Sequence, residues 1–259
     1  MKRVLTALAL IPIVAWVVLW ANPWIFLAVL AAVACLCYRE YNDIAAGYGF
    51  GAPGIVGYGA GLLFLMCWDM PWLALVGIAV AALTMVMGDE DLGHSLPRAA
   101  MLITGIVYVF GCWKCARPLR EANAHWLMYG LMLNWVGDIG AYYVGRPFGR
   151  HKLAPRVSPK KSWEGSIASV VVAGMVGTLY LQRFLPAVPL WHALVLTVAA
   201  NAAGQLGDLA ESAMKRGAKV KDSGVILPGH GGFLDRVDST LFALPVIYAY
   251  VMLMWVMSV

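Results

Sequence analysis

The stretch PLWHALVLTVAANAAGQLG (189–207) leads directly into DLAESAMKRG (208–217), so that an apolar run ends in a polar one. The first part is about 20 residues long, enough to cross roughly 30 Å of hydrocarbon as a helix. The whole chain of 259 residues has this character, because 61% of its residues are hydrophobic and only 13% are charged. Its mean hydropathy is +0.74. An ordinary soluble domain carries roughly 25% charged residues. The composition therefore predicts an integral membrane protein and excludes secreted, fibrous and disordered classes.

Nine apolar runs are candidate membrane spans, and they leave no room for a separate soluble domain. We expect an all-α, polytopic helix bundle, with N-terminal helices over 1–120 and a second region over 121–259. The first run resembles a signal peptide, but it lacks a small-residue cleavage site, so we expect it to remain as a helix. The nine runs are 4–20, 23–38, 54–68, 71–87, 99–113, 125–145, 166–185, 189–207 and 240–258.

Lysine and arginine gather in two polar loops. Loop 146–165 holds six of the 19 cations, and loop 208–239 holds five more. With nine spans, both loops and the basic N-terminus lie on one side, which the positive-inside rule assigns to the cytoplasm. We therefore expect a multi-pass protein of the cytoplasmic (inner) membrane. Lys114, Arg117 and Arg120 conflict with this orientation, because they would face outward.

Two candidate spans carry rows of polar residues at intervals of three or four, which keep each row on one helical face. We expect the two rows to face each other, with Gly137 and Gly140 allowing a neighbouring backbone to come close. The amides fit either interhelical hydrogen bonding or a functional site. Asp138 and Asp208 favour function, because a carboxylate in a low-dielectric setting needs a cation, a metal or a proton. The rows are Asn134, Asp138, Tyr142 and Arg146, and Asn201, Gln205, Asp208, Ser212 and Lys215.

Loop 146–165 contains the sequence SPKKSWEG at 158–165. Ser158 followed by Pro159 is typical of a helix N-cap, and this interpretation places Lys160 and Lys161 in the first helical turn. The helix dipole disfavours cations there, so we expect an anion at that position. A phosphate-binding role is favoured over an ordinary cytoplasmic anchor.

Loop 208–239 contains two pairs of acids at a spacing of three, Asp208 with Glu211 and Asp235 with Asp238. Each pair is expected to share a helical face. Carboxylates brought together in this way repel unless a hard cation lies among them, and oxygen ligands suit Mg²⁺. The sequence thus predicts a Mg²⁺-dependent phosphoryl-transfer site, with a second cation plausible.

Glycines in the same loop would let backbone amides approach an anion. They are Gly229, Gly231 and Gly232, and they surround His230. His230 fits two roles equally well: it donates a hydrogen bond to a phosphate or moves a proton, or it caps a turn.

These residues resemble the signature of the phosphatidate cytidylyltransferase (CDP-diacylglycerol synthase) family. The likeness is carried by SAMKR at 212–216, KD at 221–222 and PGHGGFLDRVD at 228–238. The stretches DIGAY (138–142), SPKKSWEG (158–165) and GDLAES (207–212) also resemble family segments. Specific similarity covers roughly residues 134 to 239.

The resemblance implies a dimeric, all-helical membrane enzyme that condenses CTP with phosphatidate and releases pyrophosphate. It implies that Asp208 and Asp235 are the main metal ligands, supported by Asp138 and Asp238. Asp222 beside Lys221 fits an ion-pair partner better than a ligand. The catalytic set is Asp208, Asp235, Lys215, Lys221 and His230. The substrate-binding set is Ser158, Lys160, Lys161, Ser212, Arg216, Gly229, Gly231, Gly232 and Arg236.

Two rival functions fit part of the pattern. A CTP-dependent lipid kinase of the dolichol-kinase type would use a similar charged loop to transfer the γ-phosphoryl group. A lipid transporter would place its polar groups at the bilayer midplane on repeated, broken helices, whereas here they gather toward one face. No nucleic-acid partner is expected.

Overall fold

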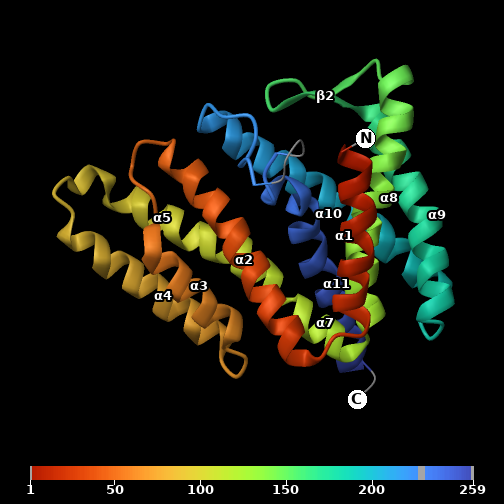
Figure 1. Cartoon of the computed structure of the whole chain (residues 1–259), viewed down its shortest axis with the longest axis horizontal. Coiled ribbons are helices and arrows are strands. Elements are labelled where there is room, and N and C mark those ends of the chain that lie inside the picture. Colours follow the sequence, from red (N-terminus) through yellow and green to blue (C-terminus); the bar gives the residue numbers. More distant parts are fainter. Residues whose placement is uncertain (1, 227–230, 258–259) are drawn as a thin grey trace. The chain divides into compact units, whose positions relative to one another are not determined.

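The computed structural model describes residues 2–226 and 231–257 (Figure 1). The chain forms two compact units, each assembled from separate segments. Each unit takes up both early and late parts of the chain, and the expected regions 1–120 and 121–259 stay a prediction. The first unit comprises Met1–Leu5, Asn22–Lys114 and Met214–Arg236, and the second comprises Thr6–Ala21, Cys115–Ala213 and Val237–Val259.

The first unit is helical and has an aromatic core. Tyr38 is fully buried and its ring lies 5.2 Å from that of Phe110 and 4.8 Å from that of Tyr58. The helix that carries Tyr38 begins where the side chain of Asn22 accepts a hydrogen bond from Trp24, an N-cap followed by proline. The elements are α2 (Pro23–Ala46), α3 (Gly54–Met66), α4 (Pro71–Met85), η1 (Val86–Gly88), η2 (Leu92–His94), α5 (Ser95–Gly105), η3 (Ile106–Gly111), α6 (Cys112–Lys114) and η4 (Leu234–Arg236).

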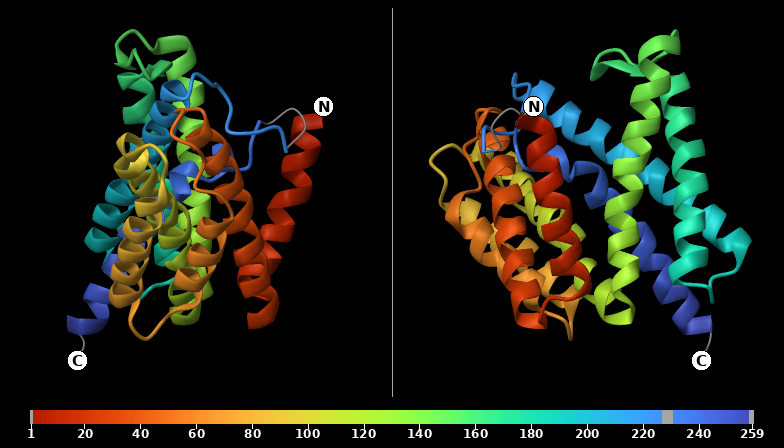
Figure 2. Two further views of the ribbon diagram at one scale, coloured as in Figure 1. Left: turned by 90° about the vertical axis from the view of Figure 1, so that its left-hand side faces the viewer. Right: turned by 45° about the vertical axis from the view of Figure 1, so that its right-hand side comes forward.

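The second unit contains the long helices that carry both polar rows. Helices α8 and α9 run side by side and are joined by a short β-hairpin (Figure 2). Helix α10 is continuous through the expected polar stripe and ends in the first unit. The elements are α1 (Lys2–Leu19), α7 (Ala116–Ala122), α8 (Ala124–Phe148), β1 (Lys152–Ala154), β2 (Ser158–Ser162), α9 (Trp163–Phe184), α10 (Leu190–Gly217) and α11 (Asp238–Met257).

Glycines on α8 allow the neighbouring helices of the second unit to come close. A Cβ atom added at Gly137 would lie 2.5 Å from Nδ2 of Asn201 on α10 and 2.7 Å from Oγ of Ser169 on α9. A Cβ atom at Gly140 would lie 2.9 Å from Cβ of Val172. Both contacts are closer than van der Waals packing allows. The predicted approach of a neighbouring backbone is seen at Gly140, where the added Cβ atom would also lie 3.1 Å from the carbonyl oxygen of Ala168, whereas Gly137 makes room for side chains.

The helical membrane-protein class is confirmed. Six helical segments among the described residues are long and apolar enough to cross a membrane. Two shorter apolar helices, Leu10–Leu19 and Gly54–Met66, fall in the first and third expected runs. Helix α8 is 25 residues long but is not among the six, and it carries one of the polar rows. The expected count of nine spans is therefore not confirmed.

The segment after α8 differs from the helix start that the sequence suggested. Residues Ser158–Ser162 form strand β2, which pairs antiparallel with β1. The N-cap of α9 is Ser162, whose side chain accepts a hydrogen bond from the Gly165 amide at 3.2 Å. The prediction that Lys160 and Lys161 occupy a first helical turn is wrong, because Ser162 is the residue that caps the helix and the two lysines precede it.

Two of the three cations that conflicted with the predicted orientation bind backbone carbonyls at helix ends, and the third, Arg117, pairs with Glu121 one turn along α7. In the first unit, Nζ of Lys114 donates to the carbonyl of Phe64 at 2.7 Å and to that of Cys67, at the end of α3. In the second unit, Nε of Arg120 donates to the carbonyl of Val18 at 2.7 Å, at the end of α1. A cation at the C-terminal end of a helix satisfies carbonyls that lack partners within the helix.

Candidate functional site

A polar cavity of about 640 Å³ lies in the second unit among α8, α9, α10 and the β-hairpin. Its volume is in the range of small-molecule sites, roughly 300–1,000 Å³. Both predicted polar rows contribute to its wall, which confirms that they face each other. Its charged and polar lining includes Asn134, Asp138, Tyr142, Arg146, Lys152, Lys160, Lys161, Ser166, Asn201, Gln205, Asp208 and Ser239.

The cationic side of the cavity comes from the β-hairpin and the end of α8. Lys161 forms an ion pair with Asp208, and the two side chains are 27% and 28% exposed. Lys152 and Lys160 are exposed on the hairpin and also line the cavity. Lys152 lies on β1, and Lys160 and Lys161 lie on β2. Although none of them is in a helix, all three line the cavity and could bind an anion there.

The amide residues of the two rows hold helices together. Nε2 of Gln205 donates to Oδ1 of Asn201 at 2.8 Å and to the carbonyl of Ser166 on α9 at 3.2 Å. Nδ2 of Asn134 donates to Oγ1 of Thr240 on α11 at 3.3 Å. Of the two interpretations of these amides, the contacts favour interhelical hydrogen bonding.

Three carboxyl groups of the second unit lie near one another where α10 and α11 meet. Asp238 interacts electrostatically with Asp208 and Glu211, and it shares a side-chain hydrogen bond with Glu211. Glu211 is fully buried and Asp238 is 7% exposed. Two carboxyl groups can share a hydrogen bond only when one carries a proton. A cation would offset the same repulsion, and carboxylate oxygens are the donors that Mg²⁺ prefers.

Within residues 2–226 and 231–257, no three Asp, Glu, His or Cys side chains are already grouped as a metal-binding cluster. Asp138 and Asp208 line the cavity, and Asp238 lies beside Asp208. Asp235 belongs to the first unit. The metal set Asp138, Asp208, Asp235 and Asp238 stays a prediction.

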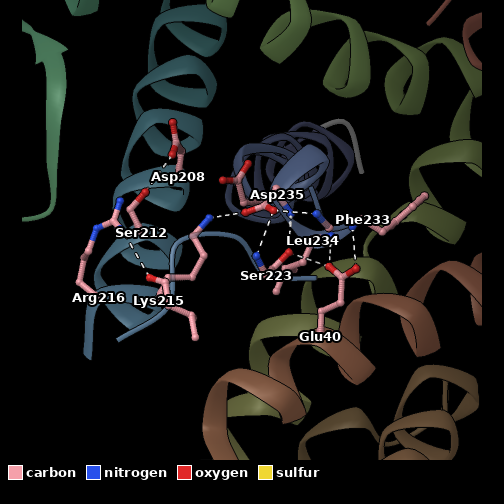
Figure 3. A network of polar contacts seen from close by, with 12 residues as sticks. Glu40, Asp208, Ser212, Lys215, Arg216, Ser223, Phe233, Leu234 and Asp235 are labelled. Carbon is pink, nitrogen blue, oxygen red and sulfur yellow. Dashed lines mark hydrogen bonds and ion pairs between the residues drawn. The ribbon is translucent and has the colours of Figure 1, made fainter. Parts of the chain in front are cut away.

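In the first unit, Asp235 is the centre of a hydrogen-bond network (Figure 3). It forms an ion pair with Lys215, and both side chains are 9% exposed. Its Oδ2 atom accepts hydrogen bonds from the amides of Gly232 at 2.9 Å and Ser223 at 3.0 Å. Burial raises the pKa of the Asp235 carboxyl, but the bonds from Lys215, Gly232 and Ser223 outweigh it, so the net pKa is lowered. Asp235 is thus held as a carboxylate.

Asp235 and Asp238 do not share an α-helical face, contrary to the sequence-based expectation. Asp235 lies in the short 3₁₀ helix η4, and α11 begins only at Asp238. The Gly232 amide donates to the carboxylate of Asp235, and the Leu234 amide donates to that of Glu40. The chain is therefore not continuously helical through Asp235 and Asp238.

The remaining predicted residues are spread over both units. Gly231 has a positive φ of 79°, which favours glycine. Ser212 donates to Asp208 at 3.4 Å, and Ser158 lies on β2. Gly229 and His230 lie outside the described residues. Three of the predicted cations, Arg216, Lys221 and Arg236, belong to the first unit and are exposed.

Two polar side chains of the network, Glu40 and Ser223, escaped the sequence analysis. Glu40 on α2 is 1% exposed and accepts hydrogen bonds from Ser223, Phe233 and Leu234 (Figure 3). In the sequence, Glu40 lies just beyond the expected span 23–38 and between Arg39 and Asp43, so nothing distinguishes it from an ordinary charge at the end of a span.

Comparison with known proteins gives a consistent result. The sequence profile described as "Cytidylyltransferase family" matches residues 1–254. A protein of Staphylococcus saprophyticus named phosphatidate cytidylyltransferase is 35% identical over 204 residues, covering 75% of this chain and 77% of the relative.

Two further relatives carry the same name. The Staphylococcus aureus protein is 34% identical over 232 residues, which cover 86% of this chain and 87% of the relative. The Bacillus subtilis protein is 42% identical over 146 residues, which cover 55% of this chain and 54% of the relative. The likeness therefore extends well beyond the C-terminal signature.

Proposed function

This chain belongs to the cytidylyltransferase family, and we propose that it condenses CTP with phosphatidate to give CDP-diacylglycerol and pyrophosphate. The names of its relatives support this substrate pair. In this reaction an oxygen of the lipid phosphate forms a bond to the α-phosphorus of CTP, and the bond from that phosphorus to the β-phosphate oxygen breaks.

The polar cavity of the second unit is the observation that carries the proposal. Lys152, Lys160 and Lys161 line it together with Asp138 and Asp208, and Lys161 pairs with Asp208. Both substrates are polyanions, so binding them together requires cations that offset their mutual repulsion. The lysines and Arg146 would bind phosphate oxygens and hold the attacking and leaving groups in line.

The first unit contributes a second set of cations. Lys215 is fixed by Asp235, and three exposed cations accompany this pair in the sequence: Arg216 follows Lys215, Arg236 follows Asp235, and Lys221 lies between them. In the proposed reaction these residues bind the phosphates of the nucleotide and stabilise the departing pyrophosphate. A phosphate nucleophile is already ionised near neutral pH, so the reaction needs little base catalysis.

We propose a requirement for Mg²⁺, held by Asp208 and Asp238 with support from Asp138 and Asp235. The carboxyl groups near the junction of α10 and α11 are the donor type that fits this ion. When bound, Mg²⁺ would neutralise charge on nucleotide oxygens and on the leaving pyrophosphate.

Membrane orientation and oligomeric state also stay proposals. We propose that the N-terminus and both polar loops face the cytoplasm, where CTP is found, because eleven of the 19 cations lie in those loops. We also propose that the chain functions as a homodimer, which the family resemblance implies.

The position of a radioactive label tests the reaction. Purified protein is incubated with phosphatidate, Mg²⁺ and CTP labelled at the α-phosphorus, and the lipid is then extracted. Label in the lipid is expected. Label that remains in soluble CDP would indicate a lipid kinase, and label that remains in unreacted CTP would contradict both enzymatic functions.

A further inference from the structure

Glu40 of α2 contacts a part of the first unit that is far away in the sequence. Its Oε2 atom accepts hydrogen bonds from Oγ of Ser223 at 2.7 Å and from the Leu234 amide at 2.7 Å. Its Oε1 atom accepts from the Phe233 amide at 2.8 Å. Both oxygens of this buried carboxylate are therefore used to hold the segment around residues 223 and 231–236.

Space around the carboxylate is limited by two glycines. A Cβ atom added at Gly232 would lie 2.3 Å from Oε2 of Glu40, and one at Gly224 would lie 2.6 Å from Oε1. Only glycine at these positions lets the backbone approach a glutamate side chain so closely. The backbone of this segment and the glutamate of α2 thus fit together at short range.

Ser223 connects Glu40 to Asp235. Its hydroxyl donates to Glu40 and accepts from the Asp235 amide at 3.3 Å, while its own amide donates to Oδ2 of Asp235. Asp235 in turn pairs with Lys215. A continuous series of contacts therefore leads from α2 through Ser223 to the side chain of Lys215 (Figure 3).

We propose that Glu40 is a positioning residue that fixes Asp235 and Lys215 for the reaction, an inference that rests on the proposed function. Glu40 itself need not contact either substrate. Two amides and one hydroxyl bound to a single buried carboxylate hold the η4 segment in place, because charge-assisted hydrogen bonds are stronger than neutral ones. Misplacing a phosphate-binding group by about 1 Å costs on the order of 100-fold in rate.

The isosteric variant Glu40→Gln tests the proposal. Glutamine keeps the shape but replaces one acceptor oxygen with an NH₂ group, which would face a donor of the segment. We expect kcat for CTP and phosphatidate to fall about 10- to 100-fold, with KM for CTP changed less than kcat. Asp43→Asn is the matched control, because Asp43 lies one turn further along α2 with an exposed side chain.

Amide hydrogen exchange gives a readout that does not depend on activity. In E40Q, the peptide containing Phe233 and Leu234 should exchange at least several-fold faster, while peptides from α8 and the D43N protein should match wild type. If the wild-type protein has no activity but E40Q still exchanges faster than wild type, the proposed function is contradicted. The role of Glu40 in holding the segment around Phe233 and Leu234 would then still stand.

Two results would overturn the positioning role. One is an E40Q protein with wild-type kcat. The other is a loss of kcat that disappears when activity is expressed per folded protein, as judged by thermal unfolding in detergent, since the role would then be purely structural.

A double-mutant cycle with Ser223→Ala tests the proposed route. Both E40Q and S223A disturb the hydrogen bond between these two side chains, and S223A also removes the acceptor of the Asp235 amide, so the combined loss of kcat should be smaller than the product of the two single losses. If the two effects multiply, Glu40 does not act through Ser223 and the route is wrong.

Discussion

Asp208 and Asp235 each pair with a lysine, but the two pairs differ in burial. The side chains of Asp208 and Lys161 are 28% and 27% exposed, whereas those of Asp235 and Lys215 are both 9% exposed. Partly exposed ion pairs contribute roughly 1 kcal/mol or less. Removing one partner of a buried pair costs about 3 kcal/mol or more, because the other charge stays buried without compensation.

We therefore predict different outcomes for Asp208→Asn and Asp235→Asn. D208N should abolish turnover while its thermal unfolding in detergent stays close to wild type. D235N should lose turnover and also unfold at a clearly lower temperature. Unfolding curves and the CTP and phosphatidate assay on the same preparations measure both effects. Near-normal activity in D208N would exclude Asp208 from the catalytic machinery.

The two hairpin lysines are predicted to differ in a similar way. Lys161 reaches Asp208 inside the cavity, whereas Lys160 is more exposed on the same strand. Lys161→Gln should raise KM for at least one substrate more than Lys160→Gln does. Arg156→Gln, at an exposed position between the two strands, serves as the control. Unchanged KM values in K161Q would show that Lys161 acts only as a topological signal.

At the level of elements, the glycines of α8 lead to a stability prediction. Gly137→Ala places a Cβ atom 2.5 Å from Nδ2 of Asn201 and 2.7 Å from Oγ of Ser169, so these hydrogen-bonded side chains or their helices must shift. Such overpacking costs about 1–3 kcal/mol, and the unfolding temperature should fall. Gly77→Ala is the matched control, because an added Cβ atom on α4 meets nothing within 4 Å. There, alanine should be neutral or stabilising by up to about 1 kcal/mol.

A G137A protein as stable as G77A would show that the Asn201 and Ser169 side chains accept the added methyl group without cost, against this prediction. Its activity would report separately on the cavity, since Asn201 also lines that opening. Activity should be compared below the unfolding temperature of both variants.

Periodic features of the elements could be predicted from the sequence, but contacts between distant segments could not. The rows through Asp138 and Asp208 follow directly from helical spacing, so their shared cavity could be anticipated. The hairpin was missed because Ser158–Pro159 resembles a helix start, although Ser162 provides the actual cap. Glu40 was missed because its partners are more than 180 residues away in the chain.

At the scale of the whole molecule, the cations that opposed the predicted orientation have a local explanation. Lys114 and Arg120 bind carbonyls at the ends of α3 and α1, respectively. A cation that stabilises a helix end contributes to folding wherever that end lies. The lysines and arginines of loops 146–165 and 208–239 therefore remain the stronger topological signal.

This orientation leads to the last prediction, which concerns the positions of single cysteines across the membrane. The variants are Lys160→Cys and Ala187→Cys, both at exposed positions, in a background whose five native cysteines are replaced by alanine or serine. If the polar loops are cytoplasmic and α9 crosses the membrane between residues 160 and 187, a membrane-impermeant maleimide should label A187C in intact cells. It should label K160C only after the membrane is opened. Labelling of K160C in intact cells would place the cavity lysines outside, where CTP is not available, and would contradict the proposed orientation and function together.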